Sequence, residues 1–296
     1  MFKMSEYSFI AGVISVGLAL GCYVIAFVAA RVMRQRTALA GVGTGGGTIG
    51  VDRRGGVNLG AYGTLLVYLA LAFLTASLVF RTIATGHGPF ANMYEFSIAF
   101  AWGTLAMYAY FERRYHERAL GLVALPIALA LLLYAMTIPA TIDPLVPALQ
   151  NNLLLSVHVA VAVVAYGTFS VAFAAAILYL VRGEDGRRGL PSRELLDEIS
   201  YKAVVIGFPF LTLTIVLGAV WAEVAWGTYW SWDPKETASL VTWLIYGSYL
   251  HARVVRGWRG ERAASLLLLG FAATLFTYFG NLFFGGLHSY SGLNNQ

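Results

Sequence analysis

Two histidines, His158 and His288, stand at the same end of the apolar segments beside them. His158 lies a few residues into one segment, in NNLLLSVHVAVAVVAYG, and His288 lies just beyond another, in FFGGLHSYSG. Ionisable groups in a membrane are costly, and this favours a functional explanation. Two imidazoles from different helices at one depth are suited to ligate a haem iron from both sides. The alternative is two unrelated interfacial histidines that are satisfied by water.

The other three histidines differ in position. His251, in YGSYLHAR, lies near the opposite end of its segment, too far from His158 and His288 to share their iron. It suits a second haem site only if a partner chain supplies the other axial ligand, because no other histidine lies in the inner half of a predicted span. His116, in ERRYHER, is typical of a solvated loop, and His87, in GHGPFANMYEF, is typical of a turn or rim.

A tryptophan-rich stretch, WAEVAWGTYWSWDPKETASLVTW, covers residues 221–243 and holds five of the seven tryptophans. It joins two long apolar segments, so it is expected at a membrane surface, where indole rings meet apolar groups and their N–H groups meet polar ones. This crowding favours a flat aromatic shelf for a large planar apolar ligand. If the stretch is helical, Trp226 and Trp230 share a face and Trp232 lies on a different side.

The residues Asp233-Pro234-Lys235-Glu236 open the next apolar segment. Asp at the N-cap, Pro at the first helical position and an acid at the third make a good helix start, and Asn92 is a similar candidate cap earlier in the chain. Capping explains Asp233 and Glu236 without catalysis. Lys235 has the charge to pair with a haem propionate or with a lipid phosphate.

The composition places these residues in a membrane protein. Of 296 residues, 58% are apolar and 12% are charged, and the mean hydropathy is +0.69. Apolar runs near the length that a bilayer requires recur, and no gap between them holds a soluble domain. We expect one all-α membrane domain over residues 1–296, a bundle of about eight transmembrane helices. The predicted spans are Phe9–Ala30, Leu59–Phe80, Tyr94–Phe111, Ala119–Pro139, Leu153–Val181, Ala203–Trp221, Thr237–Leu250 and Ala263–Phe284.

The net charge of +5 would suggest a nucleic-acid partner in a soluble protein, but here the basic residues mark topology. Seventeen of the twenty Lys and Arg residues fall in the connections after the first, third, fifth and seventh predicted spans. The positive-inside rule therefore predicts that both termini and the tryptophan-rich segment face outward. The single cysteine, Cys22, excludes an internal disulfide and is typical of a small core residue.

Two longer connections lie on the predicted cytoplasmic side. Residues 37–58 contain GVGTGGGTIG but lack the GK[ST] of a phosphate loop, and a flexible linker is expected. Residues 183–198 are charged and polar, and SRELLDEIS at 192–200 predicts a short surface helix.

The motifs taken together resemble a known family. The pattern WGxxWxWDPKE at 226–236, followed by Trp243 and by YLHxR at 249–253, resembles the WWD-domain haem-handling proteins. Within that group it is most similar to the System II cytochrome c synthesis proteins of the CcsA/ResC type. The match is clear over residues 153–290, and the segment GFP at 207–209 and GLHSY at 286–290 support it. Residues 1–150 match more loosely.

The resemblance implies a function and a site. Such proteins carry haem b to the outer side of the bacterial inner membrane, or of a thylakoid-type membrane, and present it to apocytochrome c. The cysteines of a CxxCH motif then add to the haem vinyl groups, which makes the chain a subunit of a holocytochrome c synthase. A CcsB/ResB-like membrane partner and a thiol-reducing pathway are implied as well.

Single residues follow from the same resemblance. His158 and His288 match the outer pair that ligates haem over the tryptophan-rich segment, and they act in catalysis by positioning it. The cofactor-binding residues implied there are Trp226, Trp230, Trp232 and Asp233. His251 matches the ligand of an inner haem site whose second ligand belongs to the partner.

Three alternatives stay open. A System I WWD protein would pass haem to a separate chaperone. A bis-histidine membrane cytochrome b would carry electrons from quinol, although the tryptophan-rich segment has no place in that design. A plain transporter would export haem without ligation chemistry.

Overall fold

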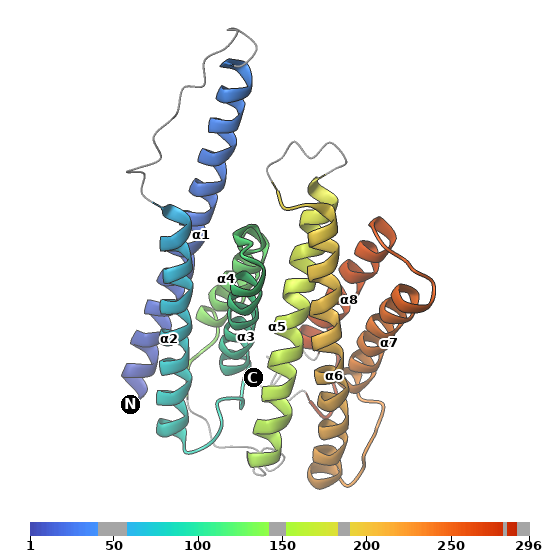
Figure 1. Ribbon diagram of the computed structural model, residues 1–296. Coiled ribbons are helices and arrows are strands. Elements are labelled where there is room, and N and C mark those ends of the chain that lie inside the picture. The colour runs from blue at the N-terminus through green and yellow to red at the C-terminus, as the bar shows by residue number, and fades with distance from the viewer. Residues whose placement is uncertain (41–57, 142–151, 183–189, 281–282, 289–296) are drawn as a thin grey trace.

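The computed structural model describes residues 1–40, 58–141, 152–182, 190–280 and 283–288. Within them the chain forms eight α-helices that run alternately up and down a single bundle (Figure 1), which confirms the all-α expectation. The helices are α1 (Phe2–Ala40), α2 (Leu59–Thr85), α3 (Met93–Tyr115), α4 (Gly121–Met136), α5 (Asn152–Arg182), α6 (Arg193–Trp226), α7 (Pro234–Val255) and α8 (Glu261–Phe279), with a 3-10 turn η1 (Arg118–Leu120) before α4.

The chain is a multi-span membrane protein. Six of its described helices are long and apolar enough to cross a bilayer: α1, α2, α4 together with η1, α5, α6 and α8. The helices α3 and α7 fall short of the expected eight spans because they carry more polar and charged side chains. In α3 the acids Glu95 and Glu112 are buried within the bundle. There they are hydrogen-bonded by other side chains of the protein, because no water is available inside the lipid.

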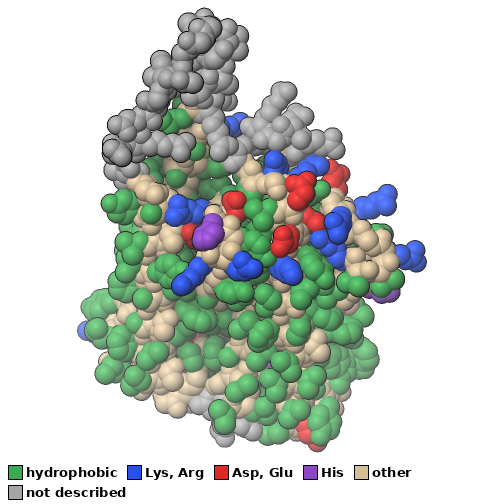
Figure 2. Space-filling model, viewed as in Figure 1, with side chains coloured by type: hydrophobic (Ala, Val, Ile, Leu, Met, Phe, Trp, Pro, Cys, Tyr) green, Lys and Arg blue, Asp and Glu red, His purple; other side chains and the backbone are tan. Residues whose placement is uncertain are grey.

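The two ends of the bundle differ in charge. The ends of α1, α3, α5 and α7 and the starts of the helices that follow them lie at one end, which we call the basic end; Lys and Arg form a band near it (Figures 1 and 2). The opposite end, which we call the site end, holds the connection between α6 and α7. Residues 41–57 of the predicted linker lie outside the described residues, as do 183–189.

Several boundaries differ from the sequence-based expectation; α1 continues to Ala40, into the linker predicted from residue 37. The predicted surface helix at 192–200 is not a separate element, because Arg193 already begins α6 and Ser192 caps it through the backbone N–H of Leu195. The last predicted span continued to Phe284, but α8 ends at Phe279, directly before Gly280.

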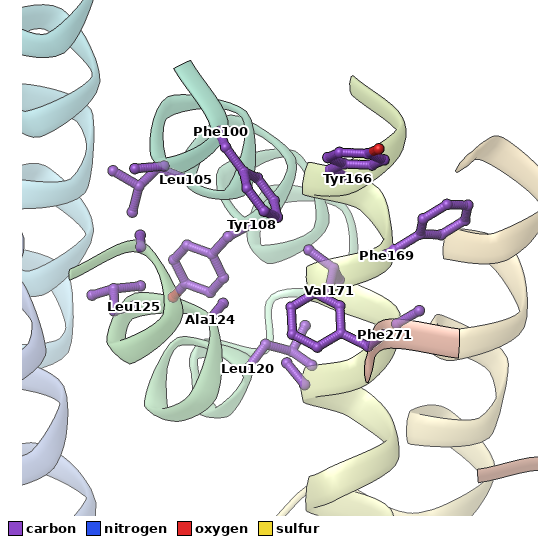
Figure 3. Close-up of a cluster of buried hydrophobic side chains, with 14 of the residues drawn as sticks. Phe100, Leu105, Tyr108, Leu120, Ala124, Leu125, Tyr166, Phe169, Val171 and Phe271 are labelled. Atoms are coloured by element: carbon purple, nitrogen blue, oxygen red, sulfur yellow. The ribbon is translucent and has the colours of Figure 1, made fainter. Parts of the chain in front are cut away.

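The centre of the bundle is α5. Buried residues make up 78% of its most apolar stretch, and it packs against α3, α6 and α8. Where α5 crosses α3, Gly167 and Gly103 let the backbones touch, since a Cβ on Gly167 would collide with the carbonyl oxygen of Gly103. Aromatic side chains fill the space around this crossing, among them Phe100 of α3 and Tyr166 of α5 (Figure 3).

A buried ion pair fixes the beginning of α3. Arg81 of α2 donates from Nε to Glu95 Oε1 at 2.6 Å, and both side chains are at most 2% exposed. The other guanidinium nitrogens donate to the carbonyls of Ala140 and Thr141, each at 2.9 Å. The second Glu95 oxygen accepts from the backbone of Ala91 at 2.7 Å. The pair thus ties α2, α3 and the segment after α4 together at the site end.

Candidate functional site

A cavity of about 950 Å³, measured with its open mouth, lies at the site end. The starts of α3, α5 and α7 and the ends of α6 and α8 form its walls. Most of the lining is apolar or aromatic. The side chains that matter for chemistry are His158, Trp221, Trp230, Lys235, Glu236 and His288.

His158 is fixed by α6, the helix that packs beside its own. Its Nδ1 lies 2.9 Å from the carbonyl oxygen of Thr214. A carbonyl oxygen only accepts hydrogen bonds, so Nδ1 carries the proton and Nε2 holds the lone pair. The imidazole fits against α6 because residue 218 is glycine: a Cβ there would lie 2.8 Å from His158 Cε1.

His288 is fixed by a carboxylate from the start of α7. Its Nδ1 lies 2.8 Å from Asp233 Oδ1, and the backbone N–H of Leu287 donates to Asp233 Oδ2 at 2.6 Å. Burial raises the pKa of Asp233, but the hydrogen bond and charge of His288 and the backbone N–H groups outweigh it and lower the pKa to about 2. Burial lowers the pKa of His288, although the bond to Asp233 opposes this. We therefore assign an ionised Asp233 and a neutral His288 whose Nε2 holds the lone pair.

Asp233 also starts α7, as the sequence predicts. Its Oδ1 accepts from the backbone of Lys235 at 2.9 Å, while Glu236 Oε2 accepts from the backbone of Asp233 at 3.2 Å, which completes a capping box. Gly286 allows the chain before His288 to reach this cap, since a Cβ there would collide with Asp233 Oδ2. One carboxylate thus caps a helix and orients an imidazole, and capping alone does not account for it.

The tryptophans do not form one flat shelf. The helix α6 ends at Trp226, because Gly227 adopts the left-handed conformation at φ 74°, so Trp226 and Trp230 share no helical face. Trp230 lines the cavity. Trp226 packs edge-on against His288, with ring centroids 4.9 Å apart and an interplanar angle of 78°. Trp232 is 69% exposed and stands perpendicular to Trp230, with centroids at 5.7 Å.

Trp221 is a cavity residue that the sequence did not single out. It is 2% exposed, and its ring lies nearly parallel to that of His158, at 9°, with centroids 6.5 Å apart. The distance from its ring centroid to that of His288 is 6.0 Å. The sequence signal that could have identified Trp221 is its helical spacing from Thr214 and Gly218. Residues three and four apart share one face of a helix, so Trp221 lies on the face of α6 that contacts His158.

The remaining histidines lie outside this cavity. His251 is exposed on α7, sixteen residues after Lys235, which is about 24 Å along a helix axis. Arg253 beside it forms a bidentate pair with Asp197 of α6, with both contacts at 2.6 Å. His116 is exposed at the end of α3, and His87 lies on the connection between α2 and α3.

Comparison with known proteins identifies relatives over most of the chain. The family model described as "Cytochrome C assembly protein" matches residues 90–288. The cytochrome c biogenesis protein CcsA of Guillardia theta is 39% identical, over 79% of this chain and 86% of the relative. CcsA of Chlamydomonas reinhardtii is 38% identical, over 80% of this chain and 68% of the relative. CcsA of Synechocystis sp. is 36% identical, over 78% and 87%.

A solved structure shares the fold. The cytochrome c haem lyase CcmF superposes with a TM-score of 0.64 at 20% identity, over 94% of this chain and 46% of that longer chain. At this identity the likeness concerns the fold alone. The family match ends at His288, and with the sequence relatives it leads to one conclusion. The chain belongs to the cytochrome c assembly protein family, and within it to the CcsA-type cytochrome c biogenesis proteins.

Proposed function

We propose that this chain holds haem b between His158 and His288 at the site end and presents it to apocytochrome c as part of a System II holocytochrome c synthase. One observation carries the proposal. Both imidazoles line one cavity, and each Nδ1–H donates to a fixed acceptor, Thr214 in one case and Asp233 in the other. Metal-ligating histidines almost always donate their second ring N–H in this way, which orients the ring and makes the ligating nitrogen more basic.

The cavity suits a macrocycle of this kind. Its lining is mostly apolar and aromatic with a few polar side chains, which is the usual make-up of a ligand pocket. Trp221 and Trp230 give it aromatic walls, and Trp226 packs edge-on against His288. Trp232 is exposed and packs against Trp230, so its indole is placed to meet the edge of the haem or the incoming polypeptide.

The chemistry of the haem itself resides in its vinyl groups, which accept the substrate thiols as thioethers. The chain contributes position: it holds the reacting edge in one place, so that a reaction between two molecules becomes effectively unimolecular. The two ligands differ in how easily they exchange. His158 is held within α5, whereas His288 lies beyond the end of α8. If the histidine of the substrate's CxxCH motif takes the place of one axial ligand, displacing His288 disturbs the fold least.

The other end of the bundle fits a second role. His251 is exposed on α7, where a membrane partner of the CcsB/ResB type can supply the other axial ligand. The basic band predicts that this end faces the cytoplasm. Haem would therefore enter near His251 and leave at the site end, and a thiol-reducing pathway would keep the substrate cysteines reduced.

The direct test is product formation in a defined system. We expect the chain, purified with its partner in lipid and loaded with ferrous haem, to attach haem covalently to a CxxCH peptide, so that it stays with the peptide during denaturing electrophoresis. A peptide with both cysteines changed to alanine is the control. Bound haem without any thioether would favour the transporter, and rapid reduction by quinol without thioether would favour the electron carrier.

The packing of His158 gives a second prediction. In Gly218→Ala the new methyl would lie 2.8 Å from His158 Cε1 and displace the imidazole. We expect haem affinity to fall about 10- to 100-fold, as when the support of a metal ligand is lost, and unfolding to change little. Titration of the purified protein measures this. Gly17→Ala in α1 is the matched control, because nothing lies within 4 Å of its Cβ position; equal affinities in both variants would count against the ligand role of His158.

A further inference from the structure

The cavity contains one cationic side chain whose role the histidine pair does not explain. Lys235, the second residue of α7, lines the cavity together with His158 and His288. Its Nζ lies 5.3 Å from the ring centroid of Phe96 on α3. Among the residues that the structure describes, this ammonium has neither an ion-pair partner nor a hydrogen-bond acceptor.

The two neighbouring acids are engaged elsewhere. The carboxylate oxygens of Asp233 accept hydrogen bonds from His288 and from the backbone N–H groups of Leu287 and Lys235. Glu236 Oε2 accepts from the backbone of Ser231 at 2.9 Å and from the backbone of Asp233. An ammonium in a largely apolar cavity is costly without a close counter-charge; here it contacts an aromatic face, and the carboxylate of Asp233 attracts it without an ion-pair contact. A ligand with an anionic group would supply that charge.

We propose that Lys235 binds a propionate of the porphyrin and so sets the rotation of the haem within its own plane. The inference rests on the proposed function and deepens it. Two axial ligands fix the position and the normal of a macrocycle, but they leave it able to turn about the axis that joins them. A cation at one side of the cavity removes that freedom, because haem b carries both of its carboxylates on one edge.

The consequence concerns the reacting groups. The vinyl groups of haem b lie on the edge away from the propionates. With a propionate held at Lys235, the vinyl edge lies on the side of the cavity away from the start of α7. Lys235 is then a positioning residue, since it acts on the thioether chemistry through the orientation of the macrocycle.

The test compares two porphyrins that differ only at their propionates, which are free carboxylates in one and methyl esters in the other. Wild type, Lys235→Gln and Lys235→Arg, each with the partner chain in phosphatidylcholine nanodiscs, are titrated with haem and with haem dimethyl ester, whose propionates are esterified. For Lys235→Gln we expect Kd for haem to rise about tenfold, the scale of losing a hydrogen bond between charged groups. Kd for the ester should not change. Arginine should retain haem affinity, and the resonance Raman propionate bending band should shift only in the glutamine variant.

Each contrary outcome has a definite meaning. Unchanged haem affinity in Lys235→Gln, or equal losses for haem and the ester, overturns the propionate contact but leaves the histidine ligands intact. A loss that appears only in nanodiscs with anionic lipid assigns the ammonium to a lipid phosphate and also overturns it. If wild type binds neither porphyrin with a bis-histidine spectrum, the proposed function fails and this inference fails with it. Lys202→Gln, an exposed lysine on α6 near the basic end, is the matched control and should bind as wild type does.

Discussion

Replacing both His158 and His288 by alanine is expected to abolish the low-spin bis-histidine haem spectrum and the covalent loading of a CxxCH substrate. The two imidazoles line one cavity from separate elements, and each is oriented by its own acceptor. The alanines remove the hydrogen bonds to the Thr214 carbonyl and the Asp233 carboxylate but leave the helices themselves, so the bundle should stay folded. Visible spectra and haem content of the variant, purified with its partner, measure the effect.

The controls for this result use the same residue type. His87→Ala/His116→Ala removes two imidazoles that lie outside the cavity and should leave the spectrum intact. Each single variant, His158→Ala or His288→Ala, should regain a low-spin spectrum when free imidazole is added, because a soluble ligand can occupy the space of the missing ring. Wild-type haem content and an unchanged spectrum in the double variant would refute the ligand assignment.

The second large effect is expected at the ion pair that anchors α3. Arg81→Met should lower the free energy of unfolding by about 3–5 kcal/mol, because Glu95 would remain buried as an unpaired charge. The carbonyls of Ala140 and Thr141 would lose the hydrogen bonds from Arg81 as well. Haem retention should fall with stability, since Phe96 of the cavity wall directly follows Glu95. Equilibrium unfolding in mixed micelles measures the change.

A double variant separates the charge from the rest of the cluster. Arg81→Met/Glu95→Leu removes both charges and should recover part of the stability, though not all, because the hydrogen bonds from Arg81 to Ala140 and Thr141 are still lost. Arg256→Met, on an exposed arginine at the end of α7, should be close to wild type. If the single and double variants unfold alike, the cost does not come from the unpaired carboxylate.

Much of the fold could be predicted because its signals are local. Apolar runs located each of the eight helices, and the caps at Asn92 and Asp233 are confirmed by side-chain bonds to Glu95 N and Lys235 N. The errors lie where local composition misleads. Polar residues at 193–199 suggested a separate surface helix, but they continue as the first turns of α6.

The site was predictable only in part. The positions of the apolar segments predicted that His158 and His288 lie at the same end of the bundle, and in the structure both line one cavity. Their partners could not be foreseen, because Thr214 and Asp233 lie more than fifty residues away along the chain. The shape of the tryptophan-rich segment depends on two residues with a left-handed backbone, Gly227 and Trp232, and the first of them turns Trp226 and Trp230 to different surroundings.

The central claim is that His158 and His288 ligate one iron at the site end. An electron cryomicroscopy map of the chain with its partner and bound haem tests it most directly. The account predicts iron between the two Nε2 atoms, with the porphyrin against Trp221 and Trp230. Haem seated at the site end with either imidazole turned away from the iron, or haem bound only near His251, would contradict it.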